Sequence, residues 1–151
     1  MDDDPSTVIG PFPGVGDARD LLPPPSDDAE VDRSALGTGR LPLRWCTSCR
    51  LHRPSALPVC PMCGSRNSVR VDASGVGTLF SWVRYHRSYL PAFASLVPYP
   101  VGLVELDEGA HVIGRLVGVD DPVIGTRLRA GFERWADGEV VPVFGPATGE
   151  W

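Results

Sequence analysis

The sequence lacks lysine altogether, because all 14 of its basic residues are arginines. Schiff-base formation, a lysine general base and a Walker-A phosphate loop each depend on an amine side chain, so this absence excludes all three. The chain also has no run of about 20 apolar residues of the kind that spans a bilayer. Its acidic start differs from the basic start of a secretory signal peptide. We therefore expect a cytoplasmic protein with no membrane contact.

Acidic and basic residues are distributed unevenly along the chain of 151 residues. Residues 1–32 carry nine acidic side chains and one arginine, whereas residues 33–71 carry seven arginines and no acid. Residues 72–151 carry ten acids and six arginines, and the formal net charge of the chain is −5. The length suits one compact domain, or two small ones that share a core.

The first 25 residues are rich in proline and glycine and have almost no periodic apolar pattern. Little burial is available there to offset the entropy cost of ordering, so we expect a disordered acidic arm over residues 1–25. The alternative is an arm that orders against a partner through its few apolar side chains, which are Val8, Ile9, Phe12, Leu21 and Leu22.

Ser26 and the acidic residues after it predict the start of a helix. A hydroxyl can accept from the unpaired first amides, and carboxylates in the first turn favour the positive end of the helix dipole. Gly37 and Gly39 predict its end. Residues 26–40 should therefore form a short helix and a connection, which needs tertiary contacts to persist.

Five segments after residue 71 are rich in β-branched and aromatic residues and are separated by turn residues. This spacing predicts a mainly β fold over residues 72–146, followed by a tail over 147–151. A five-stranded Greek-key barrel of the OB type is the preferred fold, and a two-sheet sandwich is the alternative. The expected strands cover residues 77–87, 101–106, 110–117, 126–135 and 140–144.

The four cysteines form two C-x-x-C pairs within residues 41–71: Cys46 with Cys49, then Cys60 with Cys63. Each pair can turn both sulfurs toward one point, and four thiolates can surround zinc at about 2.3 Å. Iron would also suit four soft thiolates, whereas disulfides are improbable in the cytoplasm. Because the protein would supply every ligand, we expect one structural Zn²⁺ per chain, in a zinc ribbon, with no catalytic role.

No set of residues suggests an active site. His52, His86 and His111 stand apart, and no Ser/His/Asp set or pair of carboxylates stands out. Gly75-Val-Gly77 lacks the third glycine and the following helix of a dinucleotide-binding fingerprint. We therefore predict no catalytic residues.

Two segments are candidates for binding. The arginines of residues 33–71 suit phosphates of nucleic acid or of coenzyme A, or an acidic protein surface, although the chain as a whole is acidic. Residues 88–99 carry no charge and include several aromatic side chains, which are frequent anchors at protein interfaces. We predict that this segment binds a partner protein through Tyr89, Leu90, Phe93, Leu96 and Tyr99.

Several motifs follow one another in an order that resembles a known family. They are Trp45-Cys46-Thr-Ser-Cys49, Cys60-Pro-Met-Cys63-Gly64, Gly75-Val-Gly77-Thr78-Leu-Phe80-Ser-Trp82, Pro98-Tyr99-Pro-Val-Gly-Leu-Val104-Glu105-Leu106, Ile124-Gly125 and Val141-Pro142-Val-Phe144. Over roughly residues 27–146 the chain resembles the zinc-ribbon/OB-fold proteins associated with acyl-CoA metabolism, once known only as a domain of unknown function. The resemblance implies a rubredoxin-like zinc ribbon before the barrel. Arg50 departs from the family's usual glycine after the first cysteine pair, and the arm lies outside the family pattern.

Members of that family are generally not catalysts. They accompany thiolase-fold enzymes, as separate subunits or fused to a hydratase domain, and these partners include thiolases, acyltransferases and sterol-carrier-type aldolases of steroid side-chain CoA thioesters. The resemblance therefore implies a non-catalytic scaffold subunit in a hetero-oligomer, with a contact to coenzyme A as a further expectation. A nucleic-acid-binding OB module and a carrier that holds acyl-CoA by itself are the alternatives.

Overall fold

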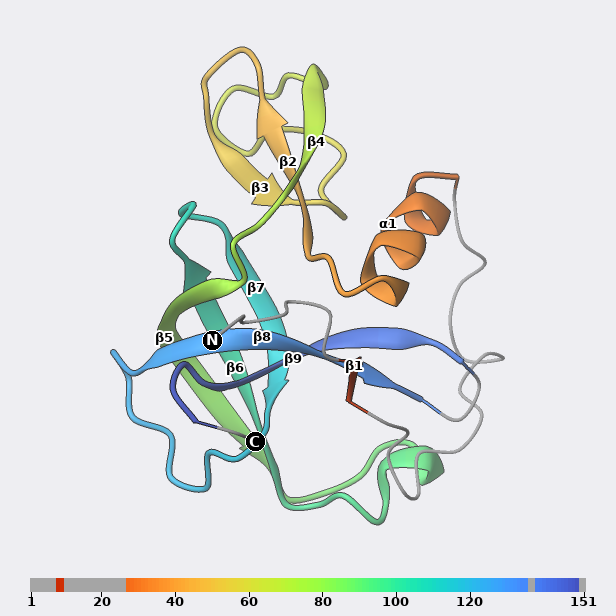
Figure 1. The fold of residues 1–151 in the computed structure, drawn as a ribbon, viewed down its shortest axis with the longest axis vertical. Helices are drawn as coiled ribbons and strands as arrows, with labels where there is room; N and C mark the ends of the chain where they lie inside the picture. Colours follow the sequence, from red (N-terminus) through yellow and green to blue (C-terminus); the bar gives the residue numbers. More distant parts are fainter. Residues whose placement is uncertain (1–7, 10–26, 136–137, 150–151) are drawn as a thin grey trace.

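The computed structural model describes residues 8–9, 27–135 and 138–149. The fold is mainly β: one α-helix, α1 (Asp27–Gly37), precedes a small three-stranded sheet, which leads into a larger sheet that closes on itself (Figure 1). No helix within these described ranges is long and apolar enough to cross a membrane.

The short helix α1 ends at a glycine-containing turn, as predicted. Gly39 has a φ of 75°, the left-handed conformation that commonly closes a helix at its carboxyl end. Two ion pairs connect the helix to the rest of the molecule: Asp32 with Arg70 of the small sheet at 3.2 Å, and Arg33 with Glu139 before the last strand at 3.5 Å. These tertiary contacts support a helix that is too short to be stable alone.

The small sheet, with its connecting loops, is called the ribbon below. Its strands are β2 (Pro42–Cys46), β3 (His52–Pro54) and β4 (Ser68–Asp72), which are antiparallel in the order β3-β2-β4. Leu43 of β2 is fully buried and belongs to the same apolar cluster as the core residues of the barrel. The ribbon is therefore anchored in the barrel core through its first strand.

Five strands form the closed barrel. Along the barrel wall each strand is hydrogen-bonded to the next in the order β5-β6-β7-β9-β8, and β8 pairs with β5 to complete the ring. Only β7 and β9 run parallel within this ring. The predicted OB-type barrel is thus confirmed, and the sandwich alternative is wrong. The strands are β5 (Val76–Tyr85), β6 (Tyr99–Leu106), β7 (His111–Leu116), β8 (Arg127–Arg134) and β9 (Val140–Pro146).

One further strand comes from the predicted arm. β1 (Val8–Ile9) pairs in parallel with Phe132 and Glu133 of β8. The rest of the predicted arm lies outside the described residues.

The connection between β5 and β6 is shifted relative to the prediction. β5 ends at Tyr85 rather than at residue 87, and β6 begins at Tyr99 rather than at residue 101. Tyr85 and Tyr99 are direct partners across the two strands, and their rings stack with centroids 5.3 Å apart. This aromatic cross-strand pair extends β6 into what the sequence predicted as loop.

The barrel strands approach one another closely at Gly77 and Gly114. A Cβ atom at Gly77 would lie 2.4 Å from the backbone oxygen of Glu105, and one at Gly114 would lie 2.7 Å from the ring of Phe144. Neither position has room for a side chain, so these glycines allow the backbone and the core ring to come together.

Gly77→Ala should destabilise the barrel, because its methyl group meets backbone that cannot rotate away. We expect the free energy of unfolding to fall by about 1–3 kcal/mol, as for other overpacked sites. Gly37→Ala is the matched control, since a Cβ there meets open space, and its effect should stay within about 0.5 kcal/mol. Urea denaturation of the two variants measures both values; equal stability of the two would contradict the account.

Candidate functional site: a cysteine cluster and a pocket at the barrel

The four cysteines converge at the tip of the ribbon. Their Sγ atoms all lie within 4.8 Å of one another, with Cys49 and Cys60 at 3.3 Å and Cys46 and Cys63 at 3.7 Å. Sulfurs bound tetrahedrally to zinc at about 2.3 Å are separated by roughly 3.8 Å. The donor set and its spacing therefore fit a metal ion, and the cluster can bind one.

Two similar turns present the sulfurs. The amide of Arg50 donates to the carbonyl of Cys46 at 2.9 Å, and the amide of Gly64 donates to the carbonyl of Cys60 at 2.8 Å. Arg50 has a φ of 59° and Gly64 a φ of 71°, so the arginine adopts the left-handed conformation that glycine adopts in the second turn. Arg50 is thus held in a conformation that costs energy for a residue with a Cβ.

The hydrogen bonds at the cluster divide the thiols into two kinds. The backbone amide of Cys49 lowers the pKa of Cys46 to about 6, and the amide of Cys63 lowers the pKa of Cys60. The hydrogen bond with Cys60 raises the pKa of Cys49 to about 12, because a second thiolate beside the first is unfavourable. A bound cation would supply the positive charge that allows all four groups to be thiolates.

Arg53 supports the second turn from inside the ribbon. Only 1% of this residue is exposed; its Nε donates to the carbonyl of Leu57 at 2.9 Å, and a terminal nitrogen donates to Ser68 Oγ at 3.2 Å. These bonds hold the segment that leads into Cys60 against β4. This role was not predicted, because in the sequence Arg53 is one of seven arginines in a basic segment.

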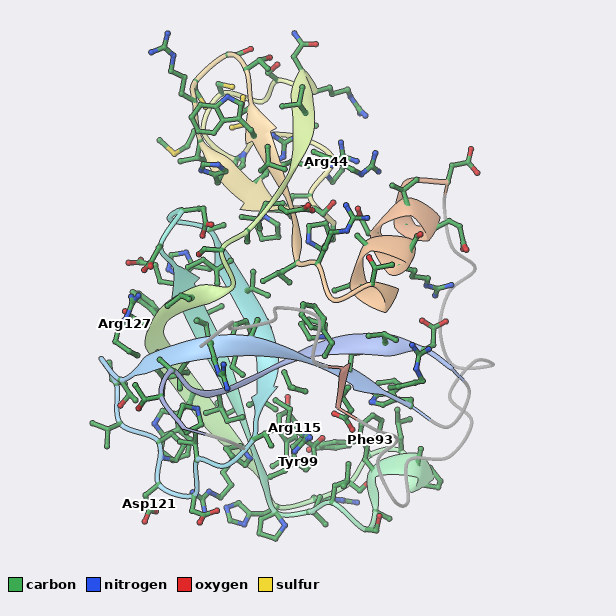
Figure 2. All side chains as sticks on the ribbon, in the orientation of Figure 1. Arg44, Phe93, Tyr99, Arg115, Asp121 and Arg127 are labelled. Atoms are coloured by element: carbon green, nitrogen blue, oxygen red, sulfur yellow. The ribbon has the colours of Figure 1, made fainter. Side chains whose placement is uncertain are left out.

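Most arginines of the basic segment, residues 33–71, make contacts within the chain. Five of its seven arginines contact other residues of the chain, and Figure 2 shows Arg44 among them on the ribbon. Three of these arginines pair with carboxylates and two donate to backbone carbonyls, which reduces the positive charge available to phosphates and weakens the nucleic-acid hypothesis. The contacts are Arg33–Glu139, Arg40–Asp72, Arg44–Ser55, Arg53–Leu57 and Arg70–Asp32.

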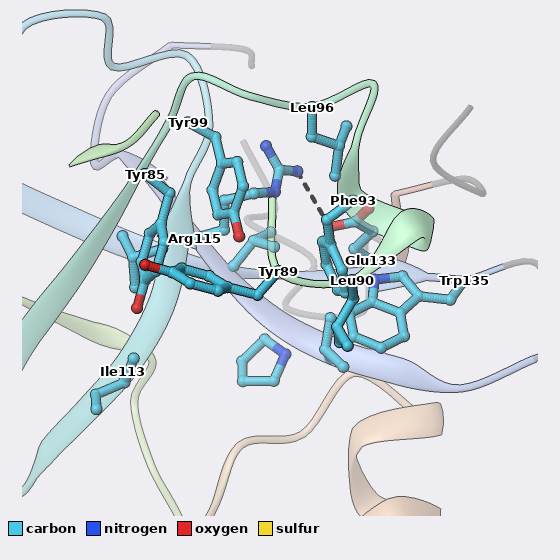
Figure 3. Close-up of a pocket in the computed structure, with 14 residues that line it drawn as sticks. Tyr85, Tyr89, Leu90, Phe93, Leu96, Tyr99, Ile113, Arg115, Glu133 and Trp135 are labelled. Carbon is cyan, nitrogen blue, oxygen red and sulfur yellow. Dashed lines mark hydrogen bonds and ion pairs between the residues drawn. The ribbon is translucent and has the colours of Figure 1, made fainter. Parts of the chain in front are cut away.

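A pocket with a volume of about 490 Å³ lies between the β5–β6 loop and strands β6 to β9 (Figure 3). All the predicted partner-binding residues line it, so the structure does bring them together. They form the wall of a hollow rather than a flat surface, and Tyr89 is the most exposed of them, at 78%. The predicted residues in this wall are Tyr89, Leu90, Phe93, Leu96 and Tyr99.

Aromatic rings in mutual contact make up part of the wall of this pocket. Phe93 meets Trp135 edge to face, with ring centroids 5.5 Å apart, and lies 6.3 Å from the ring of Tyr99. Tyr99 in turn stacks on Tyr85. The rings therefore hold one another in place and give the pocket rigid apolar walls.

A buried ion pair forms part of the pocket wall. Arg115 of β7 donates to Glu133 Oε2 of β8 at 3.1 Å, and only 2% of Glu133 is exposed (Figure 3). Burial raises the pKa of Glu133, and the positive charge of Arg115 opposes this shift. Neither residue was among the predicted site residues. β8 carries three arginines besides Glu133, so this acid does not stand out in the sequence.

Exposed apolar side chains continue outward from the pocket across β5 and β7. Ile113 of β7 is 67% exposed and lines the pocket, while Phe80 and Val83 of β5 are each 54% exposed. A second, shallow hollow connects Val83 to Tyr89. Exposed apolar area of this extent next to a pocket is typical of an interaction surface.

A ribbon with a four-cysteine cluster, followed by an OB barrel, defines the class of protein. Residues 70–133 match the family described as "ChsH2, C-terminal OB-fold domain". The solved structure of the "Ltp2-ChsH2(DUF35) aldolase" contains a chain that is 33% identical to this one, with a TM-score of 0.71, and the match covers 84% of this chain and 100% of that chain. The chain belongs to the DUF35 family, which includes the C-terminal OB-fold domain of ChsH2.

Three curated relatives carry two kinds of name, hydratase alpha subunit and scaffold protein. A "Probable enoyl-CoA hydratase alpha subunit" of Thermomonospora curvata is 38% identical over 72% of this chain, and a "DUF35 domain-containing scaffold protein" of Pyrococcus furiosus is 40% identical over 42% of it. The "3-oxo-4,17-pregnadiene-20-carboxyl-CoA hydratase alpha subunit" of Mycobacterium tuberculosis is 39% identical over 44% of it. The matches span 34%, 46% and 22% of these relatives' own lengths.

Burial of Glu133 should make stability depend on pH. Its folded-state pKa lies above the ordinary value of 4.5, so the folded chain holds this proton more tightly than the unfolded chain does. The free energy of unfolding therefore loses this contribution as pH rises from about 4.5 through the folded-state pKa. Glu133→Gln carries no such proton, so its stability relative to wild type should increase across that window.

Urea denaturation of wild type and Glu133→Gln at several pH values measures this difference. Asp121→Asn is the control, because that side chain is exposed and remote from the pocket. A wild-type-to-Gln difference that stays constant from about pH 4 to pH 8 would contradict a raised pKa.

Proposed function

We propose that this chain is a non-catalytic accessory subunit that binds and stabilises a thiolase-family enzyme acting on acyl-CoA. The observation that carries the proposal is the match to the DUF35 chain of the "Ltp2-ChsH2(DUF35) aldolase", which extends over the whole of that chain. The thiolase-fold class of the partner follows from the sequence resemblance. The scaffold name of the Pyrococcus furiosus relative supports an assisting role rather than a catalytic one.

The placement of the histidines also supports a role without catalysis. His52 packs against Trp45 in the ribbon, with centroids 4.6 Å apart, while His111 lies beside Glu105 and the ring of Phe80 on the barrel. Among the residues that the structure describes, neither is paired with a nucleophile. At the cysteine cluster the protein supplies four ligands, so a tetrahedral ion there would have no open position for substrate.

The acyl group of the proposed substrate is steroid-derived. The names of the aldolase structure and of the Mycobacterium tuberculosis hydratase subunit support this assignment. We further propose that the subunit contacts coenzyme A of the partner's substrate and works in the cytoplasm, where four reduced cysteines would persist.

We divide the chain into helix and connection (26–40), ribbon (41–71), barrel (72–146) and tail (147–151).

The partner is proposed to dock on the apolar surface around the pocket mouth. The predicted set Tyr89, Leu90, Phe93, Leu96 and Tyr99 contributes to it, with Tyr89 and Leu90 the most exposed of these. The neighbouring exposed residues of β5 and β7 extend the surface beyond the predicted loop. Aromatic anchors with surrounding apolar contacts suit a specific interface.

Tyr89→Asp should disrupt the complex, because docking would bury an unpaired carboxylate in an apolar contact. We expect at least a tenfold loss of partner in affinity capture from the native host, since burial of an unpaired charge is costly. Met62→Asp is the matched control: this side chain is 74% exposed on the ribbon, outside the proposed surface, so capture should be unchanged. A thiolase-family protein identified by mass spectrometry counts as the partner. Equal capture of this protein by both variants would contradict the docking surface. If the wild-type chain captures no thiolase-family protein, the proposed function is contradicted.

We also propose that the ion in the cysteine cluster is zinc, one per chain, with a structural role. Four thiolates at this spacing favour zinc, and the ribbon has few buried apolar residues of its own to stabilise it. Binding would therefore contribute directly to the folding of the ribbon.

Cys60→Ser should lower both zinc content and solubility, since it removes one of the four ligands. Elemental analysis of the purified wild type should find about one zinc per chain. Ser48→Ala, a change within the first turn that removes no ligand, is the control and should retain the metal. A wild-type chain that folds fully without metal would overturn the structural role.

A further inference from the structure

The pocket at the barrel is built on the scale of a small-molecule site. Its volume of about 490 Å³ falls within the range of about 300–1,000 Å³ that ligand pockets occupy. A single amino-acid side chain inserted from a partner would fill only part of it. The volume therefore favours a free ligand over an anchor residue.

The walls favour a ring system. The aromatic side chains described above form a continuous part of the pocket wall, and Pro142 and Val143 of β9 add aliphatic surface. Planar apolar rings gain both buried area and favourable ring contacts in such surroundings.

One buried polar atom gives the pocket a preference for ligands that donate a hydrogen bond. Within the described part of the chain, Glu133 Oε1 is buried and has no hydrogen-bond partner, while Oε2 is held by Arg115. A buried acceptor without a partner is costly, and a ligand that donates to it removes that cost. Since Arg115 already balances the charge of Glu133, a neutral hydroxyl suits the position better than a second cation.

We propose that this pocket binds a hydroxylated aromatic or fused-ring compound, whose rings lie against the aromatic wall that includes Phe93 and Tyr99 and whose hydroxyl donates to Glu133 Oε1. Arg115 acts as a positioning residue, since it fixes the carboxylate through the other oxygen. Ligand binding in this pocket does not depend on the proposed accessory function. The test below uses the isolated full chain, so its failure would leave the partner assay unaffected.

Two probes that differ in a single group test the proposal. 2-Naphthol carries the ring system and the hydroxyl, whereas 2-methoxynaphthalene has the same rings but no donor. Titration of the zinc-loaded full chain, followed by two-dimensional ¹H–¹⁵N NMR, gives the affinity and the location of each. We expect 2-naphthol to bind about tenfold more tightly, as for one hydrogen bond to a charged group, with shifts centred on Tyr99, Arg115 and Glu133.

A double variant tests whether the ion pair causes the preference for 2-naphthol over 2-methoxynaphthalene. Arg115→Met/Glu133→Leu replaces both members with apolar side chains of similar size, a change that buried ion pairs often tolerate. It should bind 2-methoxynaphthalene as wild type does but lose the tenfold preference for 2-naphthol. Val123→Ala is the control, because this residue is 65% exposed and lies outside the pocket, and both affinities should remain unchanged.

Three results would overturn the proposal. They are equal wild-type affinities for the two probes, no binding of either probe, and shifts that map away from the pocket. Should the double variant not fold, the comparison of the two probes with wild type still decides the question. Retention of the full preference by a folded double variant would also overturn the role of Glu133.

Discussion

The closure of the barrel by β9 is the constraint on which the rest of the structure depends. β9 pairs with β7 on one side and with β8 on the other, so residues distant in sequence meet across it. Arg115 lies opposite Val143 and Glu133 opposite Val141, which places the ion pair across the closing strand. The ion pair, and with it the buried polar atom of the pocket, therefore results from these two pairings.

The ribbon and the barrel depend on each other through different interactions. The ribbon enters the barrel core at Leu41 and Leu43, while its far end is organised by the cysteine cluster and by the buried Arg53. A metal ion at one end and a shared core at the other would fix a segment that is too short to bury a core of its own. With an ion bound, the ribbon would be a rigid extension of the barrel.

The sequence predicted features whose physical cause is local. The spacing of the cysteines predicted the convergence of their sulfurs, and turn residues between β-rich segments predicted five strands. The structure added what depends on distant contacts: the Arg115–Glu133 pair joins residues of two different strands, and the stacking of Tyr85 on Tyr99 extends β6. The selected loop residues lie together around a pocket, and this arrangement follows from barrel closure, which no local pattern encodes. That they bind a partner stays a prediction.

The most direct test of the account is the native mass of the complex that the chain forms in its own host. An accessory subunit should be found with a thiolase-family companion at a fixed ratio, and its own mass should include one zinc ion. A complex of that composition would agree with the scaffold role and would identify the enzyme that it assists. A chain recovered only as a monomer, or with nucleic acid as its companion, would contradict the account.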